Sequence, residues 1–177
     1  MALLEVLTYP DPRLATKSRP IDAVDDEVRQ LIDDMFETMY HAEGVGLAAP
    51  QIGETVRLIV LDCEQKNDEQ GAPLSRNPIA IVNPTITERE GKIVWEEGCL
   101  SVPDYVDEVE RAAKVVCEGL DRDGRPLRIE GEGLLAVCLQ HEIDHLDGVL
   151  FVDRLSRLKQ SMVKKKLEKR AKGEPSA

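Results

Sequence analysis

The sequence of 177 residues contains no run of about 20 apolar residues, the length that a membrane-spanning helix needs. It has no glycine-rich phosphate loop, and strand and helix signals do not alternate, so a nucleotide-binding fold is not expected. Its four cysteines stand at irregular spacings without a preceding secretory leader, which argues against a disulfide framework. We therefore expect one soluble, cytoplasmic catalytic or binding unit in a reducing compartment, with no membrane contact.

Histidine is also scarce, and two of the three histidines, His141 and His145, lie four residues apart. The stretch around them has apolar residues at helical spacing, so both imidazoles should lie on one face of a helix. Glu142 lies about 100° around the helix from His141, where it can reach a metal-bound water without ligating the metal. This H-E-x-x-H pattern indicates a metal site. The alternative, two buried core histidines without a ligand, would leave ring nitrogens unpaired.

A catalytic site of this kind needs a third protein ligand and one open position for water. Downstream of the motif, Phe151 stands where a metzincin has its third histidine, and Glu168 and Glu174 lie in a basic tail. The ligand should therefore come from upstream, and the candidates are His41, Cys63, Cys99, Cys117 and Cys138. Cys99 is favoured because a glycine and a proline flank it, which predicts a sharp turn with an accessible thiolate. The other cysteines fit buried apolar positions, and His41 fits the exposed end of a helix.

Three stretches resemble, in order, the signature motifs of peptide deformylase: residues 44–51 (GVGLAAPQ), 97–101 (EGCLS) and 140–146 (QHEIDHL). The resemblance extends from about residue 9 to about residue 151. It implies a catalytic domain over residues 1–153, and the composition of the residues that follow predicts a basic C-terminal helix and tail over residues 154–177. It also implies the removal of the N-formyl group from the N-terminal methionine of newly synthesised polypeptides, with release of formate.

The resemblance implies particular chemistry at these motifs. Cys99, His141 and His145 would hold one divalent metal, and the metal-bound hydroxide would attack the formyl carbon with Glu142 as general base and then general acid. The side chain of Gln51 and the backbone N–H of Leu100 would stabilise the oxyanion. Because a thiolate and two imidazoles suit several metals, zinc and nickel can occupy such a site in purified protein, although the family favours Fe²⁺.

Substrate binding is expected around the same centre. Main chain at Gly46 would pair with the peptide, and apolar side chains would receive the methionine. The residues predicted to bind substrate are Val45, Gly46, Glu97, Leu134, Val137 and Cys138. One position departs from the family pattern, because Val106 stands where an arginine is frequent, and this bears on how the peptide beyond methionine is held.

The expected fold is α+β, with antiparallel sheets packed around the central metal-binding helix, an N-terminal helix over residues 22–41 and a basic C-terminal helix. Residues 44–53 contain too many small residues for an ordinary strand, and residues 64–78 are predicted to form a surface loop. Strands are expected over residues 57–61, 79–82, 86–88, 92–95, 106–110, 114–120 and 125–130, with a hairpin turn at Asp123-Gly124.

Charge is divided unevenly along the chain. Residues 154–172 contain nine basic residues and one acid, so the rest of the chain carries −19 against a net −11. In the tail, Leu155, Leu158, Met162 and Leu167 predict a sparse apolar stripe. The tail either forms a solvated helix or makes an electrostatic contact with RNA. The family resemblance makes the ribosome the natural partner for such a contact, and no sequence-specific recognition of nucleic acid is expected.

Two other classes of protein remain as alternatives. A metal endopeptidase shares the H-E-x-x-H pattern, but it would cleave internal peptide bonds and would take a downstream third ligand. A non-enzymatic metal-stabilised protein that docks on RNA would close its metal with four protein ligands.

Overall fold

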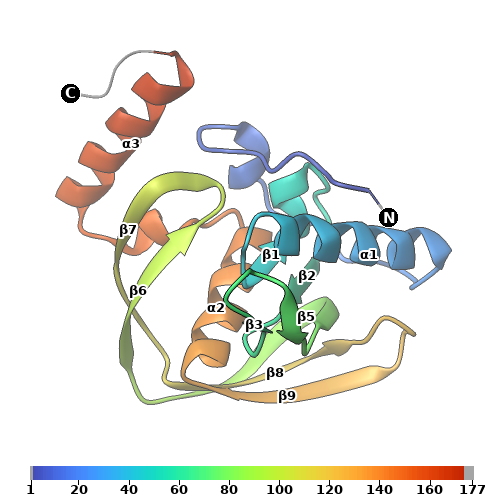
Figure 1. The fold of residues 1–177 in the computed structure, drawn as a ribbon. Helices are drawn as coiled ribbons and strands as arrows, with labels where there is room; N and C mark the ends of the chain where they lie inside the picture. Colours follow the sequence, from blue (N-terminus) through green and yellow to red (C-terminus); the bar gives the residue numbers. More distant parts are fainter. Residues whose placement is uncertain (1, 174–177) are drawn as a thin grey trace.

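The computed structural model describes residues 2–173, which fold into two antiparallel sheets and a projecting hairpin around a central helix (Figure 1). In the described part of the chain the elements are, in order, η1 (Pro12–Ala15), α1 (Asp26–His41), β1 (Gly46–Ala48), η2 (Ala49–Ile52), β2 (Leu58–Leu61), β3 (Lys66–Asn67), β4 (Pro73–Ser75), β5 (Ile79–Glu90), β6 (Ile93–Cys99), β7 (Val102–Arg111), β8 (Lys114–Leu120), β9 (Pro126–Glu132), α2 (Leu134–Leu146), η3 (Phe151–Arg154) and α3 (Arg157–Ala171). The predicted α+β class is confirmed.

The larger sheet has the strand order β1-β2-β5-β8-β9, and all its pairs are antiparallel. Side chains alternate along β2, so Ile59 and Leu61 join one core and Leu58 and Val60 join another. Helix α2 packs in the first core and α1 in the second. The apolar face of α2 is thereby held against the sheet by buried side chains, which are Ala136, Leu139, Ile143 and Leu146.

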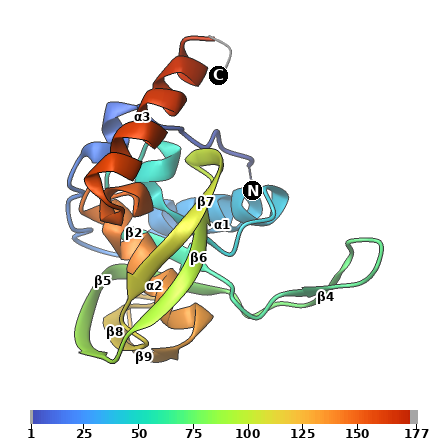
Figure 2. The same ribbon diagram turned by 90° about the vertical axis from the view of Figure 1, so that its left-hand side faces the viewer.

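The second sheet is the β6–β7 hairpin, which lies on the other side of α2 (Figures 1 and 2). Its turn is tight, because Cys99 at the end of β6 is directly opposite Val102 at the start of β7. A third core beneath this hairpin contains Phe151 and two residues of α3, Val163 and Leu167. The predicted change of chain direction at Cys99 is therefore present, and α3 packs against the hairpin that contains it.

Several predicted element boundaries are wrong. The strands expected over residues 79–82 and 86–88 form the single strand β5, whose pairing with β8 is interrupted by register shifts. Residues 64–78 contain the β3–β4 hairpin, which projects from the body in Figure 2. Residues 46–48 do form a strand, since Leu47 and Ala48 fit under α1 and α2. Helix α1 begins at Asp26, because the Asp25 side chain accepts a hydrogen bond from the Val28 N–H.

The apolar stripe predicted for the tail is wrong at two of its four positions. Leu158 and Met162 are 72% and 64% exposed, whereas Val163 and Leu167 are buried. The orientation of α3 is fixed by ion pairs with the body, between Lys159 and Asp107, Lys164 and Asp153, and Arg170 and Asp104. Residues 174–177 of the predicted tail, including Glu174, lie outside the described residues. None of the helices in residues 2–173 is long and apolar enough to cross a membrane.

Candidate metal centre

Helix α2 presents His141 and His145 on one face, with their ring centroids 5.0 Å apart. The Nδ1 atom of His141 lies 2.8 Å from a carboxylate oxygen of Glu97, so its Nε2 atom is free to ligate. His145 is 1% exposed, and burial holds its pKa well below the ordinary value. A neutral imidazole is the form that binds metal.

Cys99 reaches this pair from the turn between β6 and β7. Its Sγ atom lies 3.4 Å from His145 Nε2, and one ligand atom from each of Cys99, His141 and His145 lies within 4.8 Å of the others. A tetrahedral metal with bonds of about 2.1 Å to nitrogen and about 2.3 Å to sulfur places its ligand atoms about 3.5 Å apart. The three donors therefore fit a divalent metal, with one position left for water. Among residues 2–173 no second Cys, His, Asp or Glu cluster with metal-ligand spacing is found.

The other candidate ligands lie elsewhere in the described structure. His41 is exposed at the end of α1, Cys117 is buried between the large sheet and α2, and Cys63 lies at the edge of that core. Cys138 lines the cavity beside the metal site without joining the ligand cluster.

A buried ionic network holds His141 in place. Arg111 donates two hydrogen bonds to Glu97, at 2.7 and 2.8 Å, and a third to Asp144 at 2.6 Å. Burial by itself would raise the pKa of Glu97, but the hydrogen bonds from Arg111 and His141 outweigh it and hold that pKa below the ordinary value. Asp144 in turn accepts two hydrogen bonds from Arg154. Glu97 therefore remains a carboxylate that orients His141, and it also lines the cavity beside the metal site.

Glu142 lies beside the ligands and is 3% exposed. One of its oxygens, Oε1, is 3.9 Å from His145 Nε2 and has no hydrogen-bond partner in the described part of the chain. Burial raises the pKa of Glu142 to about 7. A carboxyl group with this pKa can accept and return a proton near neutral pH.

Gln51 closes the site from η2 and is 1% exposed, so it does not face water. Its Oε1 accepts a hydrogen bond from the Ala48 N–H, which leaves Nε2 to donate to Ser101 Oγ at 3.0 Å and to Cys99 Sγ at 3.6 Å. Leu100 follows Cys99 in the turn and lines the same cavity.

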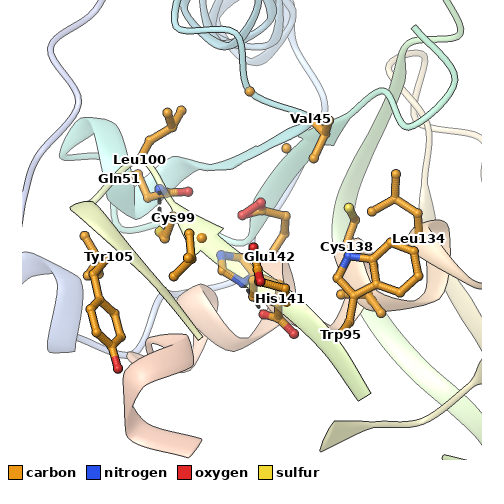
Figure 3. Close-up of a pocket in the computed structure, with 18 of the residues that line it drawn as sticks. Val45, Gln51, Trp95, Cys99, Leu100, Tyr105, Leu134, Cys138, His141 and Glu142 are labelled. Atoms are coloured by element: carbon orange, nitrogen blue, oxygen red, sulfur yellow. Dashed lines mark hydrogen bonds and ion pairs between the residues drawn. The ribbon is translucent and has the colours of Figure 1, made fainter. Parts of the chain in front are cut away.

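A cavity of about 430 Å³ opens onto these side chains (Figure 3). All the residues predicted to bind substrate line it, namely Val45, Gly46, Glu97, Leu134, Val137 and Cys138. Trp95 also lines it, beside Leu134 and Cys138 in Figure 3, and was not predicted. The alternation along β6 could have indicated Trp95, because it is two positions from Glu97 and four from Cys99. Arg111 had no comparable local signal.

Three comparisons with known proteins agree. The family model for polypeptide deformylase matches residues 3–161. A peptide deformylase of Alkalilimnicola ehrlichii is 53% identical, over 96% of this chain and 91% of that protein. The crystal structure of a peptide deformylase from Legionella pneumophila superposes with a TM-score of 0.85 at 50% identity, covering 97% of this chain and 96% of the other.

A second structure, the peptide deformylase of Ehrlichia chaffeensis in complex with actinonin, superposes with a TM-score of 0.87 at 40% identity, covering 96% of this chain and 98% of the other. The matches span nearly the whole length of both partners, and the ligand cluster lies within the residues matched by the family model. The chain belongs to the peptide deformylase family and has the metal-dependent deformylase activity of that family.

Proposed function

We propose that Cys99, His141 and His145 hold a single Fe²⁺ ion and that Glu142 carries the proton in deformylation of N-formylmethionyl nascent chains. The observation that supports this best is the buried, unpartnered Glu142 Oε1 atom beside a three-donor cluster. A divalent ion in such a site lowers the pKa of a bound water and polarises a carbonyl oxygen. Zn²⁺ and Ni²⁺ suit the same donors and serve as substitutes in purified protein.

Glu142 would take the proton of the attacking water and deliver it to the leaving amine of methionine. Its pKa of about 7 suits both steps, since the carboxyl must be a base first and an acid afterwards. Gln51 Nε2 and the Leu100 N–H would donate to the oxygen that becomes negative during attack. Because Gln51 Oε1 is already held by the Ala48 N–H, the amide is fixed with its NH₂ group toward Cys99.

The cavity suits a formylated methionine followed by an extended chain. Val45, Trp95, Leu134, Val137 and Cys138 offer an apolar lining to an unbranched thioether side chain. Among residues 2–173, β1 pairs on one side only, with β2, and β6 pairs only with β7, so each leaves a free edge beside the cavity. A peptide main chain that hydrogen-bonds at Gly46 would add a strand there.

The test is formate release from formyl-Met-Ala-Ser by anaerobically prepared protein loaded with Fe²⁺, with Glu142→Ala as the matched variant. We expect the variant to keep its metal and lose at least about 100-fold in kcat, which is the usual contribution of a positioned acid–base group. Full activity in metal-loaded Glu142→Ala would disprove the assigned proton carrier. Cleavage of internal bonds in an unformylated peptide would favour the endopeptidase alternative.

We also propose that residues 1–153 act as the catalytic unit and that the protein works in the cytoplasm. There, α3 would contact ribosomal RNA. Positions 158, 162, 165, 169 and 172 follow one another at spacings of three and four, so they lie on one face of the helix. This face carries Leu158, Met162 and three lysines that have no ion pair within residues 2–173, namely Lys165, Lys169 and Lys172.

Deleting the helix would be an ambiguous test, because it would uncover Phe151 and the β6–β7 hairpin. Charge reversal at Lys165 and Lys169 leaves this core intact. We expect Lys165→Glu/Lys169→Glu to abolish co-sedimentation with ribosomes at low salt, while the control Lys17→Glu/Lys66→Glu, with the same charge change on the body, retains it. Equal sedimentation of the two variants would contradict the proposed contact.

A further inference from the structure

The mouth of the cavity is acidic and lacks a compensating cation. Among residues 2–173, neither Lys nor Arg lines the cavity, whereas five carboxylates do: Glu43, Glu96, Glu97, Asp104 and Glu142. The ion pairs of the structure account for two of these, since Glu97 is paired with Arg111 and Asp104 with Arg170. Glu142 lies at the metal site. Two exposed carboxylates, Glu43 and Glu96, remain at the mouth with no ion pair in the described part of the chain.

Glu96 lies on the outer face of the β6–β7 hairpin. Along β6, Trp95 and Glu97 point inward and Glu96 points outward, as the alternating burial shows. Directly opposite Glu96 on β7 is Glu108, which also has no ion pair within residues 2–173. Like charges in opposite positions of an antiparallel pair destabilise it. A cationic group placed between them would relieve this repulsion.

In the part of the chain that the structure describes, the outer face of the hairpin offers no unpaired cation. Val106, on the same face of β7 as Glu108, is 57% exposed. Lys92, at the far end of the hairpin, is 3.6 Å from Glu110 and is therefore already paired. The cavity mouth thus presents uncompensated negative charge beside an apolar side chain, in a body that is itself strongly acidic.

The second residue of the substrate should meet this face. Side chains of an extended peptide alternate between two faces, so a methionine that points into the cavity places the next side chain outward. The unpartnered Glu142 Oε1 atom, buried at the inner end of the same cavity, marks where the reacting formyl group lies. This step rests on the proposed function, in which the peptide lies between the free edges of β1 and β6.

We infer that this enzyme selects formyl-methionyl peptides with lysine or arginine as the second residue over those with aspartate or glutamate, and that Glu96 and Glu43 set this preference. An ammonium or guanidinium group on a long apolar stem can contact Val106 and still reach Glu96. An acidic side chain there would add to the existing repulsion. The preference acts on peptide binding and leaves the chemistry at the metal unchanged.

The experiment compares kcat/KM for formyl-Met-Lys-Ser, formyl-Met-Gln-Ser and formyl-Met-Glu-Ser with the metal-loaded enzyme. We expect the lysine peptide to exceed the glutamate peptide about tenfold at low ionic strength, and the ratio to fall to about twofold near 0.5 M salt, because exposed charges are screened. A ratio of one, or a reversed ratio, at low salt would overturn the inference while the neutral peptide is still deformylated. No formate even from the neutral peptide would overturn the proposed function itself.

Variants then test the residues. Glu96→Gln and Glu43→Gln should each lower the lysine-to-glutamate ratio at least about twofold, and Val106→Arg should lower it further by placing a cation beside Glu96. Glu118→Gln makes the same charge change on β8 of the other sheet and should leave the ratio unchanged. A preference that survives in Glu43→Gln/Glu96→Gln, or that Glu118→Gln weakens equally, would show that overall charge and not this mouth selects the substrate.

Discussion

Gly46 lacks a side chain at the point where β1 passes the carboxylate of Glu142. A Cβ atom added at this position would lie 2.5 Å from Glu142 Oε2 and 2.9 Å from its Cδ, so the carboxylate would have to move. Gly46→Ala should therefore lower kcat by about 10- to 100-fold with the metal retained, because a displaced acid–base group loses its contribution. Formate release and metal content measured on one preparation provide the check.

The control for this prediction is Gly71→Ala in the projecting hairpin. Gly71 has a φ of +85° with no atom within 4 Å of an added Cβ, so alanine there strains the turn but touches nothing near the metal. An activity loss as large in Gly71→Ala as in Gly46→Ala would contradict the proposed clash.

Arg111 forms a salt bridge with Glu97, and both side chains are almost wholly buried. Replacing it by methionine would leave a buried carboxylate without its main partner, so Arg111→Met should lower the free energy of unfolding by about 3–5 kcal/mol. It should also weaken metal binding by about 10- to 100-fold, because Glu97 orients His141. Chemical denaturation and metal titration measure the two effects.

An exposed ion pair supplies the comparison. Arg122 pairs with Asp33 on the surface, so Arg122→Met should cost less than about 1 kcal/mol and leave metal affinity unchanged. Recovery of stability in Arg111→Met/Glu97→Gln would identify the unpaired charge as the cause. Equal losses of stability and metal affinity in Arg111→Met and Arg122→Met would show that the buried pair contributes no more than the exposed one.

Helix α3 binds the body through a face that sequence spacing identified only in part, at Leu167 and, just before the helix, at Leu155. Leu167→Ala removes a buried side chain from the third core, and we expect it to lower the free energy of unfolding by about 2–3 kcal/mol. Leu158→Ala removes an exposed leucine from the same helix and should change it by less than about 0.5 kcal/mol. Denaturant unfolding of the two variants checks the orientation of α3, and equal losses from the two variants would show that Leu158 packs on the body together with Leu167, as the predicted stripe had it.

The β6–β7 hairpin connects the two ends of the site. Its turn supplies Cys99, its inner face supplies Trp95 and Arg111, and its outer face carries Glu96. Beneath it, α3 packs through Val163 and Leu167 and pairs Arg170 with Asp104 at the cavity mouth. Metal geometry and substrate charge preference therefore depend on the placement of one hairpin.

At the scale of the whole molecule, the tightly packed interior determines how stability depends on alkaline pH. Burial raises the pKa of the Cys117 thiol from 9.0 to about 11. Between pH 9 and pH 11 the thiol ionises in the unfolded chain but stays protonated in the folded protein. The folded state is therefore fully stabilised below pH 9 and loses stability as the pH rises from 9 to 11. The shift in the pKa of Cys117 corresponds to about 3 kcal/mol of unfolding free energy. Cys117→Val should therefore lose less stability than the parent between these pH values.

Urea unfolding at pH 8 and pH 10.5 measures this difference, with Cys63→Val as the control for a less buried thiol on the same core. A parallel decline in the parent and Cys117→Val would mean that the buried thiol does not carry the effect.

The ligand set could be read from the sequence because its signals are local. Two histidines four residues apart in an apolar helical stretch must lie on one face, and a cysteine between a glycine and a proline must lie at a turn. Helix α2, strand β8 and the antiparallel architecture follow from the same short-range periodicities. The order of the three motifs was sufficient to indicate the family.

The remaining features were decided by tertiary structure, because they join residues that are distant in the chain. Sheet register brings Arg111 to Glu97 and Gly46 to Glu142, and core packing selects Leu167 over Leu158 as the buried face of α3. Periodicity gives the spacing of side chains on an element, but only the packing of that element against others determines which face is buried and which charges meet. The sequence by itself thus determined the metal ligands and the family, and the fold decided what orients the ligands, what surrounds the substrate and which charges remain unpaired at the mouth.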